Sequence, residues 1–209
     1  MRENCSQKGQ TLIETIIAIF VLTTGLTTGL GLAIYAFGAS SNIVEQITAT
    51  GLAREGIEVV RGMRDSNWLA GALADCENGQ KCYPNWLTQS YNIDGATGSG
   101  NVRIVELQPS GSNRWSIKSP ASGDYHLYVQ PSGAYSSLAN TNPTTYFRKI
   151  FLIRQSESAP YTATSPLLLV RVVVWWHGKN CAPIQDYNNP SDSTCKIVTE
   201  EYLTNWKNY

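Results

Sequence analysis

The chain begins with a short charged segment, which is followed by a long stretch without charged residues. No charged residue occurs between Glu14 and Glu45, and the twenty-three residues 15–37 (TIIAIFVLTTGLTTGLGLAIYAF) are predominantly apolar. As a helix this run would span about 35 Å, enough to cross a hydrocarbon core of about 30 Å. It is longer than the apolar region of a secretory signal peptide, which has about 7–15 residues. The pattern therefore predicts one membrane-spanning helix.

The helical period continues beyond this run and becomes amphipathic. Apolar residues recur at steps of three and four, with charged residues between them. The apolar set is Ile43, Ile47, Ala53, Ile57 and Val60, and the charged set is Glu45, Arg54, Glu55, Glu58 and Arg61. The polar triplet at 65–67 predicts the end of the helix. One helix over 10–67 is expected, with its apolar half in lipid and its amphipathic half packed on a globular body.

The remaining chain predicts a loop region and then a sheet. Residues 68–100 are rich in Gly, Asn and Ser and show no clear period, which is typical of a long connection with short elements. Alternating or aromatic runs bounded by turn residues predict strands at 102–107, 115–118, 125–130, 146–154, 167–176 and 197–203. Residues 101–209 are expected to form an antiparallel meander. The predicted fold class is α+β, with a long N-terminal helix on one face of an antiparallel sheet.

The amino-acid composition excludes several classes of function. In 209 residues, sixteen Lys and Arg balance sixteen Asp and Glu, which excludes a nucleic-acid binder held by bulk positive charge. Two histidines without a local Cys/His cluster predict no metal site, and no cofactor is expected. The chain contains no G-x-S-x-G, H-E-x-x-H or P-loop motif, so we expect a protein that is not an enzyme.

The flanks of the apolar run predict its orientation. Arg2 and Lys8 precede it, offset by Glu3, and this weakly favours a cytoplasmic N-terminus and an exported body. Glu14 lies at the start of the apolar segment, where a carboxylate is costly. It is either an interfacial acid near the positive end of the helix dipole or a buried acid that awaits a partner charge.

The residues around Glu14 carry a resemblance. The run Lys8-Gly9-Gln10-Thr11-Leu12-Ile13-Glu14, followed by the apolar stretch, resembles the class III signal of type IV pilins and pseudopilins. The resemblance implies that residues 1–9 are a leader, which a prepilin peptidase removes by cutting after Gly9. Gln10 would become the new N-terminus and the site of N-methylation, although the family usually has Phe there. Glu14 would be the fifth mature residue, pairing with a neighbour's amine and setting the register of assembly.

Two other segments are similar to PilV-type minor pilins. They are residues 51–68 and the pair Trp175-Trp176 together with Tyr202-Leu203-Thr204-Asn205-Trp206. The resemblance implies a pilin-like fold and a structural subunit of a type IV pilus-like filament, a minor pilin. It would be a single-pass protein of the cell membrane and then part of a surface filament or a periplasm-like space. Expected partners are other pilin subunits, the prepilin peptidase, the membrane and the inner-membrane assembly platform, without direct nucleic-acid binding.

Two alternatives remain open at this stage. The first is a pseudopilin of a type II secretion or DNA-uptake machine, because pilins and pseudopilins share the same kind of N-terminal signal and apolar helix. The second is an uncleaved, membrane-anchored binding protein that never polymerises, which would keep Met1. Within the apolar run, Gly25, Gly29 and Gly31 favour either close helix packing through G-x-x-x-G or local loosening of the helix.

Five cysteines divide between the proposed leader and the body. Cys5 would leave with the leader, and the four others allow three pairings. We favour Cys76–Cys82 and Cys181–Cys195, because each pair closes a short loop, and the second resembles the disulfide-bounded C-terminal region of many pilins. Four free thiols in a reducing compartment are the alternative.

The aromatic and basic residues of the body also have two interpretations. The six tryptophans, at 68, 86, 115, 175, 176 and 206, serve core and inter-subunit packing or form a surface on which sugars or bases stack. His126 and His177 are expected at the surface or rim. Arg148-Lys149 with Arg154 is left open as a local basic patch.

Overall fold

The computed structural model describes residues 8–75, 81–96, 100–108, 114–120, 124–155, 167–178, 181 and 194–205. The chain divides into two compact units, Met1–Val44 and Glu45–Tyr209. One helix, α1 (Lys8–Ala70), contributes residues to both units. All other regular elements belong to the second unit, which we call the body.

Helix α1 ends later than the polar triplet at 65–67 predicts. The Ser66 hydroxyl donates to the Gly62 carbonyl at 2.8 Å, a bond that the helix interior tolerates. Asn67 turns its side chain into the body instead of ending the helix. The Gly71 N–H still donates to the Asn67 carbonyl at 2.9 Å, so the chain leaves the helix only after Ala70.

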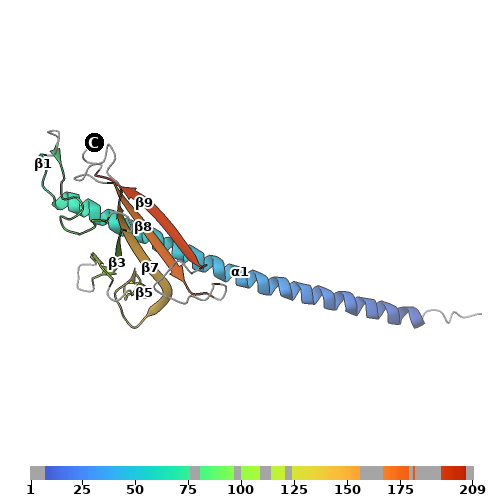
Figure 1. The fold of residues 1–209 in the computed structure, drawn as a ribbon. Coiled ribbons are helices and arrows are strands. Elements are labelled where there is room, and N and C mark those ends of the chain that lie inside the picture. The colour runs from blue at the N-terminus through green and yellow to red at the C-terminus, as the bar shows by residue number, and fades with distance from the viewer. Residues whose placement is uncertain are drawn as a thin grey trace, which may run out of the picture. The chain divides into compact units, whose positions relative to one another are not determined.

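The body contains one large antiparallel sheet and one small hairpin. The hairpin pairs β1 (Ala74–Asp75) with β2 (Lys81–Cys82). The strands of the large sheet are β3 (Asn101–Leu107), β4 (Trp115–Lys118), β5 (His126–Val129), β6 (Tyr135–Ser136), β7 (Pro143–Arg154), β8 (Leu168–Trp176) and β9 (Lys196–Leu203). The α+β layout expected from the pattern is therefore present. Figure 1 shows β7, β8 and β9 side by side along the part of α1 that belongs to the body.

The predicted simple meander is wrong for the first half of the sheet. β7, β8 and β9 do follow one another as antiparallel neighbours. The other edge of β7, however, is shared by two hairpins, because β3 pairs with it at residues 150–152 and β5 pairs with it at Phe147. β7 has twelve residues, so its free edge is long enough for two short strands. The Ser137 N–H, which donates to the Val105 carbonyl at 3.2 Å, ties the two hairpins together.

The glycine that precedes β3 allows the chain to approach β7 closely. Gly100 has φ of 75°, and a Cβ there would lie 2.5 Å from Ile153 Cγ1. Both the backbone angle and the contact exclude a larger residue.

The main core lies between α1 and one face of the sheet. The alternation along β7 and β8 directs one side-chain set toward the helix. The buried sheet residues in this core include Val105, Leu127, Ile150, Leu152, Leu168, Val170, Val172, Val174, Trp176 and Leu203, and the helix supplies Ala49, Leu52, Ala53, Ile57, Val59, Val60, Met63 and Trp68. A second buried cluster contains Ile104, Tyr125, Val173 and Trp175, and its three strand residues, Ile104, Val173 and Trp175, alternate with residues of the main core.

Candidate functional site

The N-terminal unit presents a long and largely apolar surface. Between Leu12 and Phe37 its large apolar side chains are 57% to 79% exposed. In water such a surface is far larger than soluble proteins leave uncovered. The helix is long enough and apolar enough to cross a membrane, by length and composition. The unit therefore requires apolar surroundings, whether lipid or other protein.

Five threonine hydroxyls of this helix are satisfied by the helix's own backbone. Thr15, Thr23, Thr24, Thr27 and Thr28 each donate a hydroxyl hydrogen bond to a carbonyl three or four residues earlier, at 2.8–3.1 Å. A hydroxyl bonded in this way needs no water, which is what a hydrocarbon environment demands. The five threonines are thus compatible with the membrane-spanning helix that the sequence predicts.

The three glycines of the apolar run lie in continuous α-helix. A Cβ at Gly25, Gly29 or Gly31 would meet no atom within 4 Å. Gly25 and Gly29 open a shallow apolar depression of about 480 Å³, lined by Val21, Leu22, Gly25, Leu26, Gly29, Leu30 and Ala33. Gly31 is not part of it. The depression has the form that close helix packing through G-x-x-x-G uses.

The residues of the proposed processing signal lie at the start of α1. Gly9 and Gln10 are helical, whereas the Gln10 side chain and residues 1–7 of the proposed leader 1–9 lie outside the described residues. Glu14 is exposed on the helix surface one turn further on.

The part of α1 in the body is joined to the sheet by a buried arginine that the sequence did not single out for this role. Arg148 is 1% exposed, and its Nη1 donates to the Leu52 carbonyl at 3.2 Å and lies 3.3 Å from Glu55 Oε1. Burial lowers the pKa of the Arg148 guanidinium below its ordinary value, and the Glu55 carboxylate opposes this. A signal was present, because Arg148 has the same strand parity as the inward-facing Ile150 and Leu152.

Close approach of the helix to β8 depends on Gly56. A Cβ there would lie 3.1 Å from Val172 Cγ1 and 3.4 Å from Arg148 Cδ. A larger side chain would push the helix from the sheet and from the arginine.

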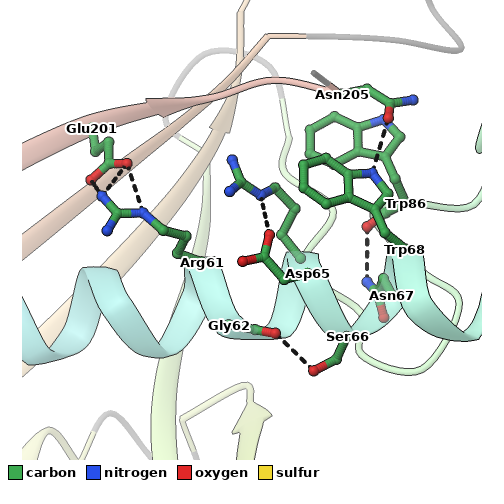
Figure 2. A network of polar contacts seen from close by, with 10 residues as sticks. Arg61, Gly62, Asp65, Ser66, Asn67, Trp68, Trp86, Glu201 and Asn205 are labelled. Carbon is green, nitrogen blue, oxygen red and sulfur yellow. Dashed lines mark hydrogen bonds and ion pairs between the residues drawn. The ribbon is translucent and has the colours of Figure 1, made fainter. Parts of the chain in front are cut away.

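A network at the C-terminal end of α1 ties three distant segments together (Figure 2). Asn67 is fully buried and makes four hydrogen bonds to the turn after the helix: its Nδ2 donates to the carbonyls of Trp86 and Tyr91 at 2.9 Å, and its Oδ1 accepts from the N–H groups of Ser90 and Tyr91 at 2.8 Å. Trp68 Nε1 donates to Asn205 Oδ1 at 2.9 Å, and Asn205 Nδ2 donates to the Tyr83 carbonyl at 3.2 Å.

About two turns earlier, a partly buried ion pair joins α1 to the edge strand. Arg61 Nε donates to Glu201 Oε1 at 3.1 Å, and these bonds raise the pKa of the arginine. The hydrogen bond from Trp68 to Asn205 joins two segments that are far apart in the chain. Sequence reasoning noted both segments separately but not their contact.

The local basic patch left open by the sequence does not form. Arg148 is buried under the helix, and Arg154 Nη2 lies 2.6 Å from Asp94 Oδ1. Lys149 Nζ lies 4.3 Å from the centre of the Tyr125 ring. These cations therefore serve internal contacts rather than one shared surface for a polyanion.

The two histidines are brought together around one aromatic ring. His126 stacks on Phe147 with ring centres 4.6 Å apart, and His177 meets the same ring edge-on at 5.2 Å. Burial lowers the pKa of His177, and the nearby His126 lowers it further.

This pKa shift predicts a pH dependence of stability. The unfolded chain has the higher histidine pKa, about 6.5, and therefore binds the proton first. We expect the free energy of unfolding to have its maximum value above about pH 7 and to fall as the pH drops through 6.5 toward the pKa of His177 in the folded state. Urea unfolding at pH 7.5 and 5.5 measures this, and His177→Phe, which keeps an aromatic ring, should flatten the difference. An equal difference in wild type and variant would contradict the assignment.

One of the two expected disulfides is present. Cys181 and Cys195 are bonded, with their Cα atoms 5.4 Å apart, and close the connection between β8 and β9. Cys76 and Cys5 lie outside the described residues, as does the side chain of Cys82. Within the described ranges, no group of three or more His, Cys, Asp or Glu is placed to hold a metal ion. Comparison with protein-family models, with curated proteins and with solved structures gives no match.

Proposed function

We propose that this chain is a structural subunit of a type IV pilus-like filament, in the position of a minor pilin. The observation that carries the proposal is the exposed apolar helix surface from Leu12 to Phe37, which follows directly on the Gly9-Gln10…Glu14 signal. A helix of this kind is stable in a bilayer before assembly and among the helices of other subunits afterwards.

The body supports this proposal in two ways. Its helix is held to the sheet by an inward-facing arginine, by Gly56 and by the Asn67 network, so pulling on the helix is transmitted to the sheet. The disulfide between Cys181 and Cys195 fits an exported body. A pseudopilin would share both features. Recovery of the subunit in long surface fibres, rather than only with a secretion complex, favours the pilus.

Processing is the experiment that tests the proposal. In a host with a prepilin peptidase, intact mass and N-terminal sequencing should show that the mature chain starts at Gln10, with or without one added methyl group. Gly9→Val should leave the chain at Met1, because the family's peptidase depends on glycine at this position. Gly38→Val is the matched control, since a Cβ at Gly38 would meet no atom within 4 Å and it lies outside the signal. A wild-type chain that starts at Met1 would overturn the proposal and leave an uncleaved anchored protein.

A further inference from the structure

The structure separates the tryptophans by exposure. Trp68, Trp86, Trp175 and Trp176 are each 5% exposed or less, so they serve packing. Trp206 lies outside the described residues. Among the described tryptophans, Trp115 alone is half-buried, with part of its surface left open. The stacking surface raised by the sequence therefore reduces to the surroundings of Trp115.

Trp115 lines a cleft in the body. The cleft has a volume of about 480 Å³ and is lined by Ser90, Tyr91, Asn92, Gln108, Arg114, Trp115, Ser116 and Ile117. Small-molecule sites have volumes of roughly 300–1,000 Å³. One wall comes from residues 90–92, in the segment after β2, and the other from the β3–β4 hairpin. The lining combines two aromatic rings with one guanidinium, two amides and three hydroxyls, one of which belongs to Tyr91.

The aromatic part of the cleft is held rigidly. Tyr91 and Trp115 both pack against the main core with part of their surface. The backbone of Tyr91 is bonded at its N–H and its carbonyl to the Asn67 side chain. Trp115 lies opposite Leu107 in the β3–β4 register. A ligand that stacks here loses little free energy to ordering of the protein.

The polar side chains of the cleft are held in place by hydrogen bonds, and some of their donors and acceptors remain available to a ligand. Arg114 Nε donates to the Tyr91 hydroxyl at 2.9 Å, and the guanidinium carbon lies 5.5 Å from the centre of the Tyr91 ring. The two terminal nitrogens of Arg114 have no hydrogen-bond partner among the described residues. Gln108 Nε2 donates to Ser116 Oγ at 2.8 Å, which leaves its carbonyl oxygen as an acceptor. These groups can bind a carboxylate and hydroxyls at the same time.

The charge of the lining residues narrows the class of ligand that the cleft can bind. It contains one cation and no carboxylate. The acids nearest in sequence are already paired, Asp94 with Arg154 and Glu106 with Lys118. A single-stranded nucleic acid needs a groove of several cations along its phosphates, and one arginine does not provide it.

We propose that this cleft binds a short acidic oligosaccharide. The apolar C–H face of one sugar ring packs on the Trp115 indole through dispersion contacts. The carboxylate of the same or the next sugar accepts hydrogen bonds from the terminal nitrogens of Arg114. Gln108 and Asn92 contact ring hydroxyls. All residues of this site belong to the body.

The test uses the full chain in a detergent without a sugar headgroup. The probes are trigalacturonate, a hyaluronan tetrasaccharide and 3′-sialyllactose, each with its methyl ester, and a short oligothymidylate. Titration calorimetry should detect binding of at least one acidic oligosaccharide, with its neutral ester bound about tenfold more weakly. Binding of none of the three, or equal binding of acid and ester, overturns the proposal. Tighter binding of oligothymidylate overturns it in favour of a nucleic-acid site.

The variants separate the two contacts. Trp115→Ala should weaken binding about tenfold or more, whereas Trp115→Phe, which keeps a flat ring, should weaken it about threefold or less. Arg114→Gln should weaken binding of the acid to the level of its ester and leave the ester unchanged. Tyr202→Ala, at an aromatic side chain that is 56% exposed on β9, is the matched control and should bind as wild type does. If Trp115→Ala does not fold, the Arg114→Gln variant still tests the proposal, because Arg114 is exposed. Unchanged binding of the acidic oligosaccharide by Arg114→Gln overturns the proposal.

Discussion

Asn67→Asp is expected to lower the free energy of unfolding of the body by about 4 kcal/mol at neutral pH. The exchange preserves shape but removes the Nδ2 donor that now serves the carbonyls of Trp86 and Tyr91. The Trp86 carbonyl would lose this donor, at a cost of about 1–3 kcal/mol, whereas the Tyr91 carbonyl keeps the Ile93 N–H at 3.1 Å. A carboxylate that faces two carbonyls in a fully buried position adds a charge penalty. Urea unfolding of the full chain in detergent, followed by tryptophan fluorescence, measures the change through Trp68 and Trp86.

The loss should also depend on pH. The buried carboxyl group that the substitution introduces would have a raised pKa, so the destabilisation should be largest above that pKa and should shrink as the pH falls and the carboxyl takes up a proton. Asn92→Asp is the matched control in the same turn, because the Asn92 side chain uses its oxygen to accept from the Asp94 N–H at 3.2 Å, which a carboxylate does equally well. It should change stability by less than about 0.5 kcal/mol. Equal unfolding midpoints for the two variants would contradict the role given to Asn67.

Glu14→Gln is expected to leave the protein in the membrane and to lower its incorporation into filaments by at least about a hundredfold. This prediction rests on the proposed function. The proposed cleavage after Gly9 would place a charged α-amine on Gln10 in apolar surroundings, where the carboxylate of a neighbouring Glu14 is its expected partner. Removing one partner of a buried ion pair costs about 3–5 kcal/mol, and about 1.4 kcal/mol corresponds to a factor of ten. Quantitative immunoblotting of sheared filaments and of membranes gives the ratio.

Two controls make this result specific. Glu58→Gln removes a carboxylate that is 61% exposed on the same helix, within the body, and should incorporate within about twofold of wild type. N-terminal sequencing should show that Glu14→Gln is still cleaved at Gln10, which separates assembly from processing. Normal incorporation of a correctly cleaved Glu14→Gln chain would show that Glu14 is an interfacial acid without a role in register.

The long helix and most strand positions could be predicted because both depend on local periodicity. An apolar run without charge and a following period of three and four residues are enough for a helix such as α1. The strands lie close to the predicted ranges, with β4 at 115–118 as expected and β7 beginning at Pro143 instead of 146. The helix end was missed because Asn67, a residue typical of helix termini, is used for tertiary hydrogen bonds instead.

Some candidate sites could likewise be recognised from the sequence, and others only from the tertiary structure. The Gly9–Glu14 signal and the Gly25–Gly29 spacing are contiguous in sequence, so they can be recognised without any structure. The inward turn of Arg148, the contact of Trp68 with Asn205 and the cleft at Trp115 join residues far apart in the chain. Trp68 and Asn205 are separated by 137 positions, and no local period specifies such a pair.

Hydrophobic and polar order along the chain therefore establishes which segments are helix or strand and which faces are apolar. Strand neighbours, by contrast, follow from how all apolar faces are covered at once, and this is why two hairpins share one edge of β7 where a meander was expected. The same reason governs the tryptophans, whose exposure depends on what packs over them. Side-chain period is a property of adjacent residues, whereas burial and pairing are properties of the whole packed body.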